Sequence, residues 1–221
     1  MLLALDTATQ MVGLALHDGA EVRAETIWMG GGRQTVEMAP EVALALRRQG
    51  ASSSALTALA VAIGPGSYTG LRIGLALAKG IALAHNLPLI GVPTFDILAR
   101  AQPRQDEPML ALIRAGRGHA AGMWYKWKSS AWQPISEVVS LAWSELEAIL
   151  AEPTYIVGEL DGPTRAALAE SPGMRLATPA LCVRRPSYLA EMAWERVRSG
   201  DSGDPAAVNP IYLKPEVAQT A

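Results

Sequence analysis

The chain has 221 residues, half of them apolar, and its 21 acids against 19 lysines and arginines give a formal charge of -2. This length and composition allow one large or two small domains with a substantial core. The charges are scattered, which excludes a large basic field for nucleic acid or an anionic membrane. A single cysteine, Cys182, excludes an internal disulfide and fits a reducing compartment.

The N-terminal segment does not have the pattern of an export signal. MLLALDTATQ lacks a basic region and reaches Asp6 after a few apolar residues. The longest apolar segment, Leu71 to His85, carries Arg72 and Lys79 and is shorter than the ~20 residues of a membrane span. We therefore expect a soluble, cytoplasmic protein without membrane contact.

Three strands and a helix are expected at the start of the chain. LLALDTAT indicates a short buried strand and a turn, and MVGLAL alternates as a half-buried strand does. Asp18-Gly19 is typical of a tight hairpin, here leading to a third strand through Trp28. After a flexible GGGR segment, apolar residues at helical spacing predict a helix from Val36 to Arg48 with a kink at Pro40.

A strand, a loop and a second helix follow. ALAVAI is apolar on both faces, which predicts a central parallel strand ending at Ile63. The Gly-rich segment GPGSYTG comes next, and then a helix from Leu71 to Asn86. LPLIGV predicts a further strand, and Thr94 is placed to cap a helix through Leu98.

The pattern predicts two lobes, 1–102 and 103–221. The boundary falls in AQPRQDEP, where apolar residues give way to proline and charge. In the second lobe GMWYKWK resembles an exposed edge strand, WSELEAIL an amphipathic helix and TYIVG a buried strand. A last helix is expected from Tyr188 to Val197, and the tail after Lys214 is expected to be frayed.

The Gly-rich loop has two interpretations, which both remain open. Its GxGxxxG spacing is neither the GxxxxGK[ST] phosphate loop nor the GxGxxG dinucleotide fingerprint. The glycines could form a tight turn in which Ser67 or Thr69 caps the following helix. They could also expose backbone N–H groups to an anion at the helix N-terminus. Asp6, at the end of the first strand, is either a turn acceptor or a ligand for Mg²⁺ or phosphate.

The helix after the loop is apolar on every side, which is typical of a helix buried on every side. Gly74, Ala78 and Ala82 are spaced four residues apart and would allow a second helix to approach closely. Either a partner covers the remaining face, or the helix lies between the sheet and the helix from Val36 to Arg48.

Few residues are candidates for catalysis. His17, His85 and His119 have no HxxxH or HExxH spacing and are interpreted as surface histidines. No GxSxG nucleophile elbow is present. Cys182 is interpreted as a packed thiol, although the neighbouring arginines could lower its pKa. WYKWKSSAW either stacks single-stranded RNA or packs its aromatic side chains inward, with the lysines outward.

The order of these elements resembles the actin-like ATPase superfamily and, within it, the bacterial TsaB (YeaZ) family. LALDTAT and IGPGSYTGLRIG carry this resemblance, PLIGVPT continues it, and NPIYLKP is similar to the family's C-terminal PxYLR signature. The resemblance implies an actin-like, RNase H-like α/β fold of two lobes, each with a mixed sheet flanked by helices. It covers the whole chain and is strongest up to Thr94.

The resemblance also implies a function. The family member is a non-catalytic partner of a paralogous subunit that carries the metal and transfers a threonylcarbamoyl group to the adenosine beside the tRNA anticodon. A small P-loop ATPase subunit completes the set, and tRNA is reached through the complex. The chain alone could form a homodimer. No metal or tightly bound cofactor is expected, and ATP is expected at most at a subunit junction.

Two sets of site residues follow, and neither is catalytic. A residual nucleotide or phosphate contact would use Asp6, Thr7, Gly64, Gly66, Ser67, Thr69 and Gly70. The partner interface would use Val36, Ala39, Leu71, Arg72, Gly74, Leu75, Ala78 and Ala82.

The second lobe departs from the family pattern. Where relatives commonly read IDARxGEVY, this chain reads IRAGRGHAAGMWY, with Arg114 and His119 in the positions of the two acids. A scaffold tolerates that loss more easily than an enzyme does. The alternative functions are a small ATP-dependent phosphotransferase using Asp6, Gly64, Gly66 and Ser67, and a glycoprotease, which the lack of paired histidines disfavours.

Overall fold

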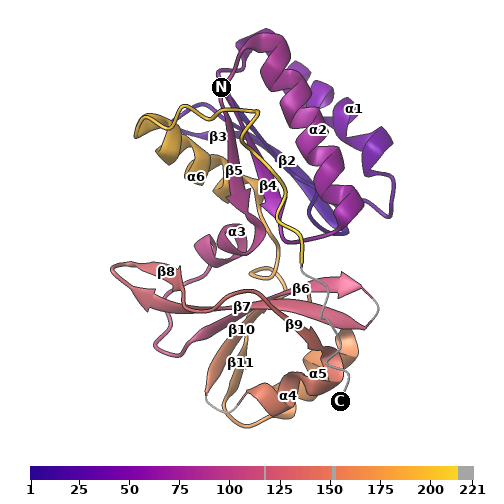
Figure 1. Ribbon diagram of the computed structural model, residues 1–221, viewed down its shortest axis with the longest axis vertical. Helices are drawn as coiled ribbons and strands as arrows, with labels where there is room; N and C mark the ends of the chain where they lie inside the picture. The colour runs from indigo at the N-terminus through magenta and orange to yellow at the C-terminus, as the bar shows by residue number, and fades with distance from the viewer. Residues whose placement is uncertain (117, 151–152, 214–221) are drawn as a thin grey trace. The chain divides into compact units, whose positions relative to one another are not determined.

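The computed structural model describes residues 1–116, 118–150 and 153–213, and the chain divides into two compact units (Figure 1). Unit 1 comprises Met1–Ile97 and Arg184–Ile211. Unit 2 comprises Leu98–Val183 and the residues from Tyr212 onward. The expected division after Gln102 is thus corrected, because residues 184–211 return to the first unit.

Unit 1 contains a five-stranded mixed sheet of order β3-β2-β1-β4-β5. Its strands are β1 (Leu2–Asp6), β2 (Met11–His17), β3 (Val22–Met29), β4 (Ala58–Gly64) and β5 (Leu89–Pro93). The first three form an antiparallel meander, and β4 lies parallel to both β1 and β5. The predicted meander and the predicted central parallel strand are therefore confirmed.

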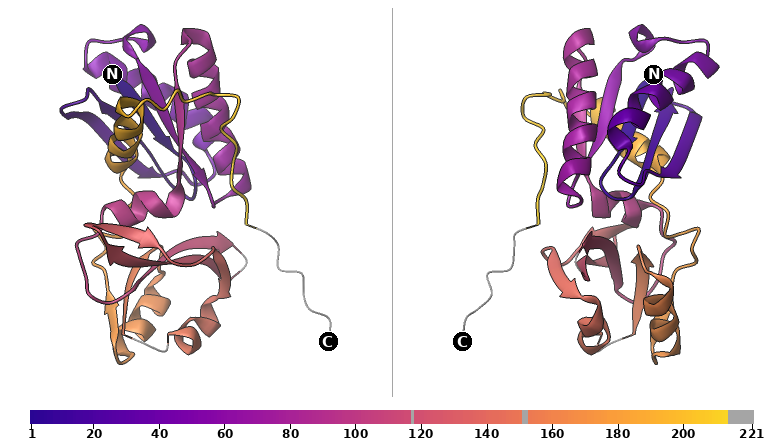
Figure 2. Two further views of the ribbon diagram at one scale, coloured as in Figure 1. Left: turned by 60° about the vertical axis from the view of Figure 1, so that its left-hand side comes forward. Right: turned by 90° about the vertical axis from the view of Figure 1, so that its right-hand side faces the viewer.

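Helices cover both faces of this sheet (Figure 2). Helices α1 (Gln34–Arg48) and α2 (Tyr68–His85) cover one face, and α6 (Pro186–Arg198) covers the other. The remaining helices near this sheet in the sequence are η1 (Ser53–Ala55) and α3 (Thr94–Arg100). Along β1, Leu3 and Leu5 join the core under α1 and α2, whereas Leu2 and Ala4 join the core under α6. Side chains alternate across a strand, so β1 must be apolar throughout to serve both cores.

Helix α6 is fixed to the meander at its N-terminus. The Arg185 guanidinium Nε donates to the Glu25 carboxylate at 3.0 Å, and the Ser187 backbone N–H donates to the same carboxylate at 2.9 Å. Burial raises the pKa of Glu25, but these hydrogen bonds outweigh burial and leave the pKa below its usual value. The ionised carboxylate therefore holds the start of α6 against β3.

The chain after α6 returns along the parallel side of the sheet. The Leu89 N–H of β5 donates to the Gly203 carbonyl at 2.7 Å, and the Ile211 N–H donates to the Ile63 carbonyl of β4 at 2.7 Å. Covering an edge strand in this way hides backbone groups that would otherwise pair with other chains. The predicted tail beyond Lys214 lies outside the described residues.

Unit 2 contains a sheet of order β11-β10-β6-β7-β8, with β9 also paired to β7. Its elements are β6 (Met109–Gly116), β7 (His119–Lys128), β8 (Ala131–Pro134), β9 (Val139–Ala142), η2 (Trp143–Glu145), α4 (Leu146–Ile149), β10 (Thr154–Gly158), α5 (Gly162–Glu170) and β11 (Met174–Leu176). The prediction of an edge strand at GMWYKWK is wrong, because β7 has neighbours on both sides. TYIVG forms the predicted buried strand.

Across the ranges that the structure describes, no helix is sufficiently long and apolar to cross a bilayer. The longest apolar helix, α2, instead packs along β4 and β1 of its own unit.

Candidate functional site

The Gly-rich loop joins β4 to α2 and is packed tightly against its own chain. A Cβ at Gly66 would lie 2.2 Å from the Ala8 carbonyl oxygen, and one at Gly70 would lie 2.2 Å from that of Thr7. Gly64 has φ +107°, where L side chains are strained, and a Cβ there would meet the Ile211 carbonyl at 2.3 Å. All three glycines are therefore required by the close approach of the chain's own backbone.

The hydroxyl groups beside the loop are used within the fold. The Ser67 side chain accepts the Gly70 N–H at 3.2 Å and caps α2, as the tight-turn interpretation predicts. The Thr7 hydroxyl donates to the Gly70 carbonyl at 2.7 Å, and the Ser67 N–H donates to the Ala8 carbonyl at 2.6 Å. Thr69 is exposed. The turn after β1 thus holds the N-terminus of α2 in place.

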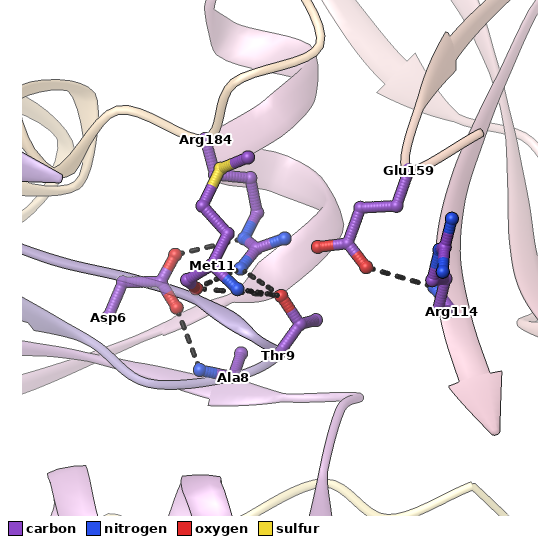
Figure 3. A network of polar contacts seen from close by, with 7 residues as sticks. All are labelled: Asp6, Ala8, Thr9, Met11, Arg114, Glu159 and Arg184. Atoms are coloured by element: carbon purple, nitrogen blue, oxygen red, sulfur yellow. Dashed lines mark hydrogen bonds and ion pairs between the residues drawn. The ribbon is translucent and has the colours of Figure 1, made fainter. Parts of the chain in front are cut away.

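Asp6 lies at the carboxyl end of β1 and forms a buried ion pair with Arg184 (Figure 3). The Arg184 Nε donates to the carboxylate at 2.9 Å, and the two side chains are 1% and 2% exposed. Another guanidinium nitrogen of Arg184 donates to the Thr9 hydroxyl at 2.8 Å and to the Met11 carbonyl at 3.0 Å. No pattern in the sequence around Asp6 predicts this partner.

The Asp6 carboxylate also accepts the Ala8 N–H at 2.9 Å, which is the turn-acceptor role considered from the sequence. One oxygen of Asp6 therefore shapes the turn, and the other receives the guanidinium. The charge that a divalent cation would neutralise is already neutralised by Arg184.

Helix α2 directs its stripe of small residues at its own sheet. Ala78 and Ala82 are 0% exposed and belong to the core formed with β1, β2 and β4. A Cβ at Gly74 would lie 2.2 Å from the Thr7 hydroxyl oxygen. Leu71 and Leu75 are likewise buried. The prediction that these five residues bind a partner is wrong, because the sheet occupies the closely packed face.

The exposed side of α2 forms a groove with α1. The groove has a volume of about 480 Å³ and is lined by Gln34, Thr35, Met38, Ala39, Tyr68, Thr69, Arg72, Ile73, Ala76 and Leu77. Beside it on α1, Val36 is 68% exposed. Of the predicted interface, Val36, Ala39 and Arg72 thus lie at the surface.

Local contacts fix side chains in and beside this groove. The Arg72 guanidinium carbon lies 4.1 Å from the centroid of the Tyr68 ring, a cation–π contact that holds both side chains at the start of α2. Outside the groove lining, Glu37 of α1 accepts the Trp28 indole N–H at 2.9 Å and pairs with Arg33 at 2.8 Å, which ties α1 to β3. The groove is thus an apolar surface bordered by fixed polar side chains.

In unit 2, the positions that depart from the family pattern are at the surface. Arg114 and His119 are exposed. The backbone N–H of Arg114 donates to the Glu159 carboxylate at 3.1 Å (Figure 3). Asp161 caps α5, and the hydrogen bonds from Thr164 lower its pKa. Glu159, which the sequence analysis did not single out, therefore holds the end of β6.

Two other candidates for catalysis or metal binding, Cys182 and His17, make contacts within the fold. Cys182 is buried, as predicted, and its Sγ receives the Gly158 N–H at 3.4 Å and an Arg165 guanidinium N–H at 3.3 Å. His17 is not a surface histidine, because it is 6% exposed and its Nδ1 accepts the Gly19 N–H at 3.0 Å. Within the described residues, no cluster of three or more His, Cys, Asp or Glu side chains is suited to a metal ion.

The fold of this chain matches that of a solved structure. The match to the solved structure of YeaZ from Pseudomonas aeruginosa has a TM-score of 0.75 at 22% identity and covers 96% of this chain and 99% of that one. The predicted α/β fold with two mixed sheets flanked by helices is therefore confirmed, and it is the fold of this YeaZ structure.

Sequence comparison then identifies the family. The model described as "TsaD: tRNA N6-adenosine threonylcarbamoyltransferase" matches residues 33–147, just over half of the chain, and the chain belongs to this family. The Bacillus subtilis protein named "tRNA threonylcarbamoyladenosine biosynthesis protein TsaB" is 28% identical over 96% of this chain and 93% of its own length. The Escherichia coli protein of that name is 38% identical over 53% of this chain and 51% of its own length.

The orientation of α2 predicts opposite effects for one substitution at two positions. Gly74→Ala should lower the free energy of unfolding by about 1–3 kcal/mol, because its Cβ collides with the Thr7 hydroxyl. Gly80→Ala should raise it by about 0.5–1 kcal/mol, because nothing lies within 4 Å of that Cβ and alanine favours a helix. Urea denaturation measures both. Equal effects at the two positions would contradict the described orientation.

The buried ion pair predicts strong coupling between two distant residues. Arg184→Met should lower the free energy of unfolding by about 3–5 kcal/mol, because it leaves the Asp6 carboxylate buried without its cation. The double variant Asp6→Asn/Arg184→Met should lose less than Arg184→Met alone, since it removes the uncompensated charge. Losses that simply add in the double-mutant cycle would refute the pairing.

Proposed function

We propose that this chain is a non-catalytic subunit that pairs with a paralogous threonylcarbamoyl transferase subunit and thereby supports formation of threonylcarbamoyladenosine beside the tRNA anticodon. The names of the full-length relatives and the family match support this assignment. The transferase subunit supplies the chemistry, and this chain supplies a surface that holds it.

The groove between α1 and α2 is the observation that carries the proposal. It presents an apolar surface built from two adjacent helices, with Met38 and Ala39 on one side and Ala76 and Arg72 on the other. Partner helices bind such grooves by placing apolar side chains in them. The partner therefore lies on the face of α2 opposite the sheet, and not on the small-residue face inferred from sequence.

The neutralised Asp6 and the closed loop favour a scaffold over a phosphotransferase. Phosphoryl transfer depends on cations and donors placed around the phosphates. In this chain Arg184 pairs with Asp6, and Ser67 caps its own helix. A nucleotide contact by this chain would therefore be limited to the exposed start of α2, at a junction with another subunit. A small P-loop ATPase subunit and tRNA would join through the assembled complex.

The test is pairing with the transferase subunit from the same organism, measured by size exclusion with light scattering. Ala76→Glu places a charge in the groove and should reduce the affinity of pairing by at least about tenfold, because an unpaired charge is costly to bury in an interface. Its matched control is Ala166→Glu, which makes the same change on the exposed face of α5 and should pair normally.

Normal pairing of Ala76→Glu, with Ala166→Glu also unaffected, would exclude the groove as the interface. Failure of the unsubstituted chain to form a species at the summed mass would overturn the partner function itself. Ala78→Glu does not serve this test, because that residue faces the sheet and its substitution would disrupt folding. A homodimer of the chain alone, if it uses the same face, should also dissociate in Ala76→Glu.

A further inference from the structure

A short stretch of unit 2 carries positive charge and no acidic residue. Residues 108–136 contain two arginines and two lysines and no aspartate or glutamate. The rest of the chain has 15 lysines and arginines against 21 acids. A chain that is acidic as a whole thus has a short basic segment in β6, β7 and β8.

The two lysines of this segment lie on the hairpin formed by β7 and β8. Lys126 and Lys128 are opposite Gln133 and Ala131, respectively, and both lysines are exposed. They are two residues apart on one strand, so they point to the same face about 7 Å apart. Among the interactions of the described residues, neither lysine has an ion pair. Their charge is therefore available to a ligand.

Apolar surface accompanies the lysines on their face of the hairpin. Trp124 shares that face of β7 and is half-buried, because part of its ring packs against the core of unit 2. Ile135, whose N–H donates to the Trp124 carbonyl at 2.8 Å, is 49% exposed. The face thus combines cations with an aromatic ring and an aliphatic side chain.

The opposite face makes the hairpin rigid. Trp127 and Trp132 are directly opposite each other in the ladder and pack edge to face, with ring centroids 5.5 Å apart. The Trp132 indole N–H donates to the Gln102 carbonyl at 3.3 Å. Ser129 and Ser130, both with positive φ, form the tight turn that connects the strands. The lysines therefore project from a fixed scaffold.

We propose that the Lys126 and Lys128 face of the β7–β8 hairpin binds the phosphate backbone of RNA, with Trp124 and Ile135 against a base or ribose. Charge complementarity selects this occupant, because phosphates attract a pair of lysines and the adjacent aromatic ring offers a stacking surface. This inference rests on the proposed function, in which the RNA is the tRNA that the complex modifies. The surface lies in unit 2, whereas the partner groove lies in unit 1.

The probe is an unmodified transfer RNA transcript titrated with the full chain, with binding measured by fluorescence anisotropy at several salt concentrations. The test variant is Lys126→Gln/Lys128→Gln. The matched control is Arg47→Gln/Arg48→Gln, which removes two exposed charges from the end of α1. Both variants have the same net charge, so a difference in RNA binding between them depends on where the two charges were removed.

Each lost phosphate contact lowers the salt slope of single-strand binding by about 0.7, so the lysine variant should have a slope smaller by about 1.4. Its loss of affinity between about 50 and 200 mM salt should therefore be about sevenfold less than that of the unsubstituted chain. The salt slope of the arginine variant should differ from that of the unsubstituted chain by less than half as much, that is, by less than about 0.7.

Equal slopes for the two variants, or no RNA binding by the unsubstituted chain at low salt, would overturn the RNA surface. Binding of polyglutamate that requires the lysines, without binding of transfer RNA, would also overturn it and assign the face to an acidic protein segment. Light scattering with the transferase subunit distinguishes these failures from failure of the proposed function, because pairing does not depend on the hairpin.

Discussion

The buried ion pair between Asp6 and Arg184 is the interaction on which the organisation of unit 1 depends. It joins the end of the first strand to the residues that precede α6, across 178 positions of sequence. A buried carboxylate without a cation is strongly unfavourable, so the chain must bring Arg184 back to this sheet. Helix α6 then covers the face opposite α1 and α2, and its N-terminus is fixed further by Glu25.

The same carboxylate determines the position of α2. Asp6 accepts the Ala8 N–H, Ala8 accepts the Ser67 N–H, and Ser67 caps the helix. Glycines at positions 66 and 70 allow this approach, since any side chain would collide with the turn after β1. A loop whose sequence resembles a phosphate loop is thus held by contacts within the chain, while the outer side of its helix stays exposed.

The sequence predicted the elements of unit 1 well because their signals are local. Asp18-Gly19 marks the hairpin, and the doubly apolar β4 marks the centre of a sheet. Which face of α2 meets the sheet was not predictable, because a stripe of Gly74, Ala78 and Ala82 suits a sheet as well as a partner helix. Only the contact between Gly74 and Thr7, distant in sequence, decides between them.

The other wrong predictions concern contacts between residues that are distant in sequence. No local pattern indicates that α6 belongs to the first sheet or that Arg184 faces Asp6. The interior position of β7 also escaped prediction, because its partners β8 and β9 are short strands with weak periodicity. The sequence therefore assigned to a partner the face of α2 that the sheet of unit 1 covers.

Amide hydrogen exchange of the full chain, alone and with the transferase subunit, tests the central claim most directly, because binding slows exchange where it covers or stabilises a segment. The account predicts slower exchange in α1 and α2 on pairing, with α5 and β10 of unit 2 unchanged. Slower exchange confined to α6 or to unit 2, with α1 and α2 unchanged, would contradict it.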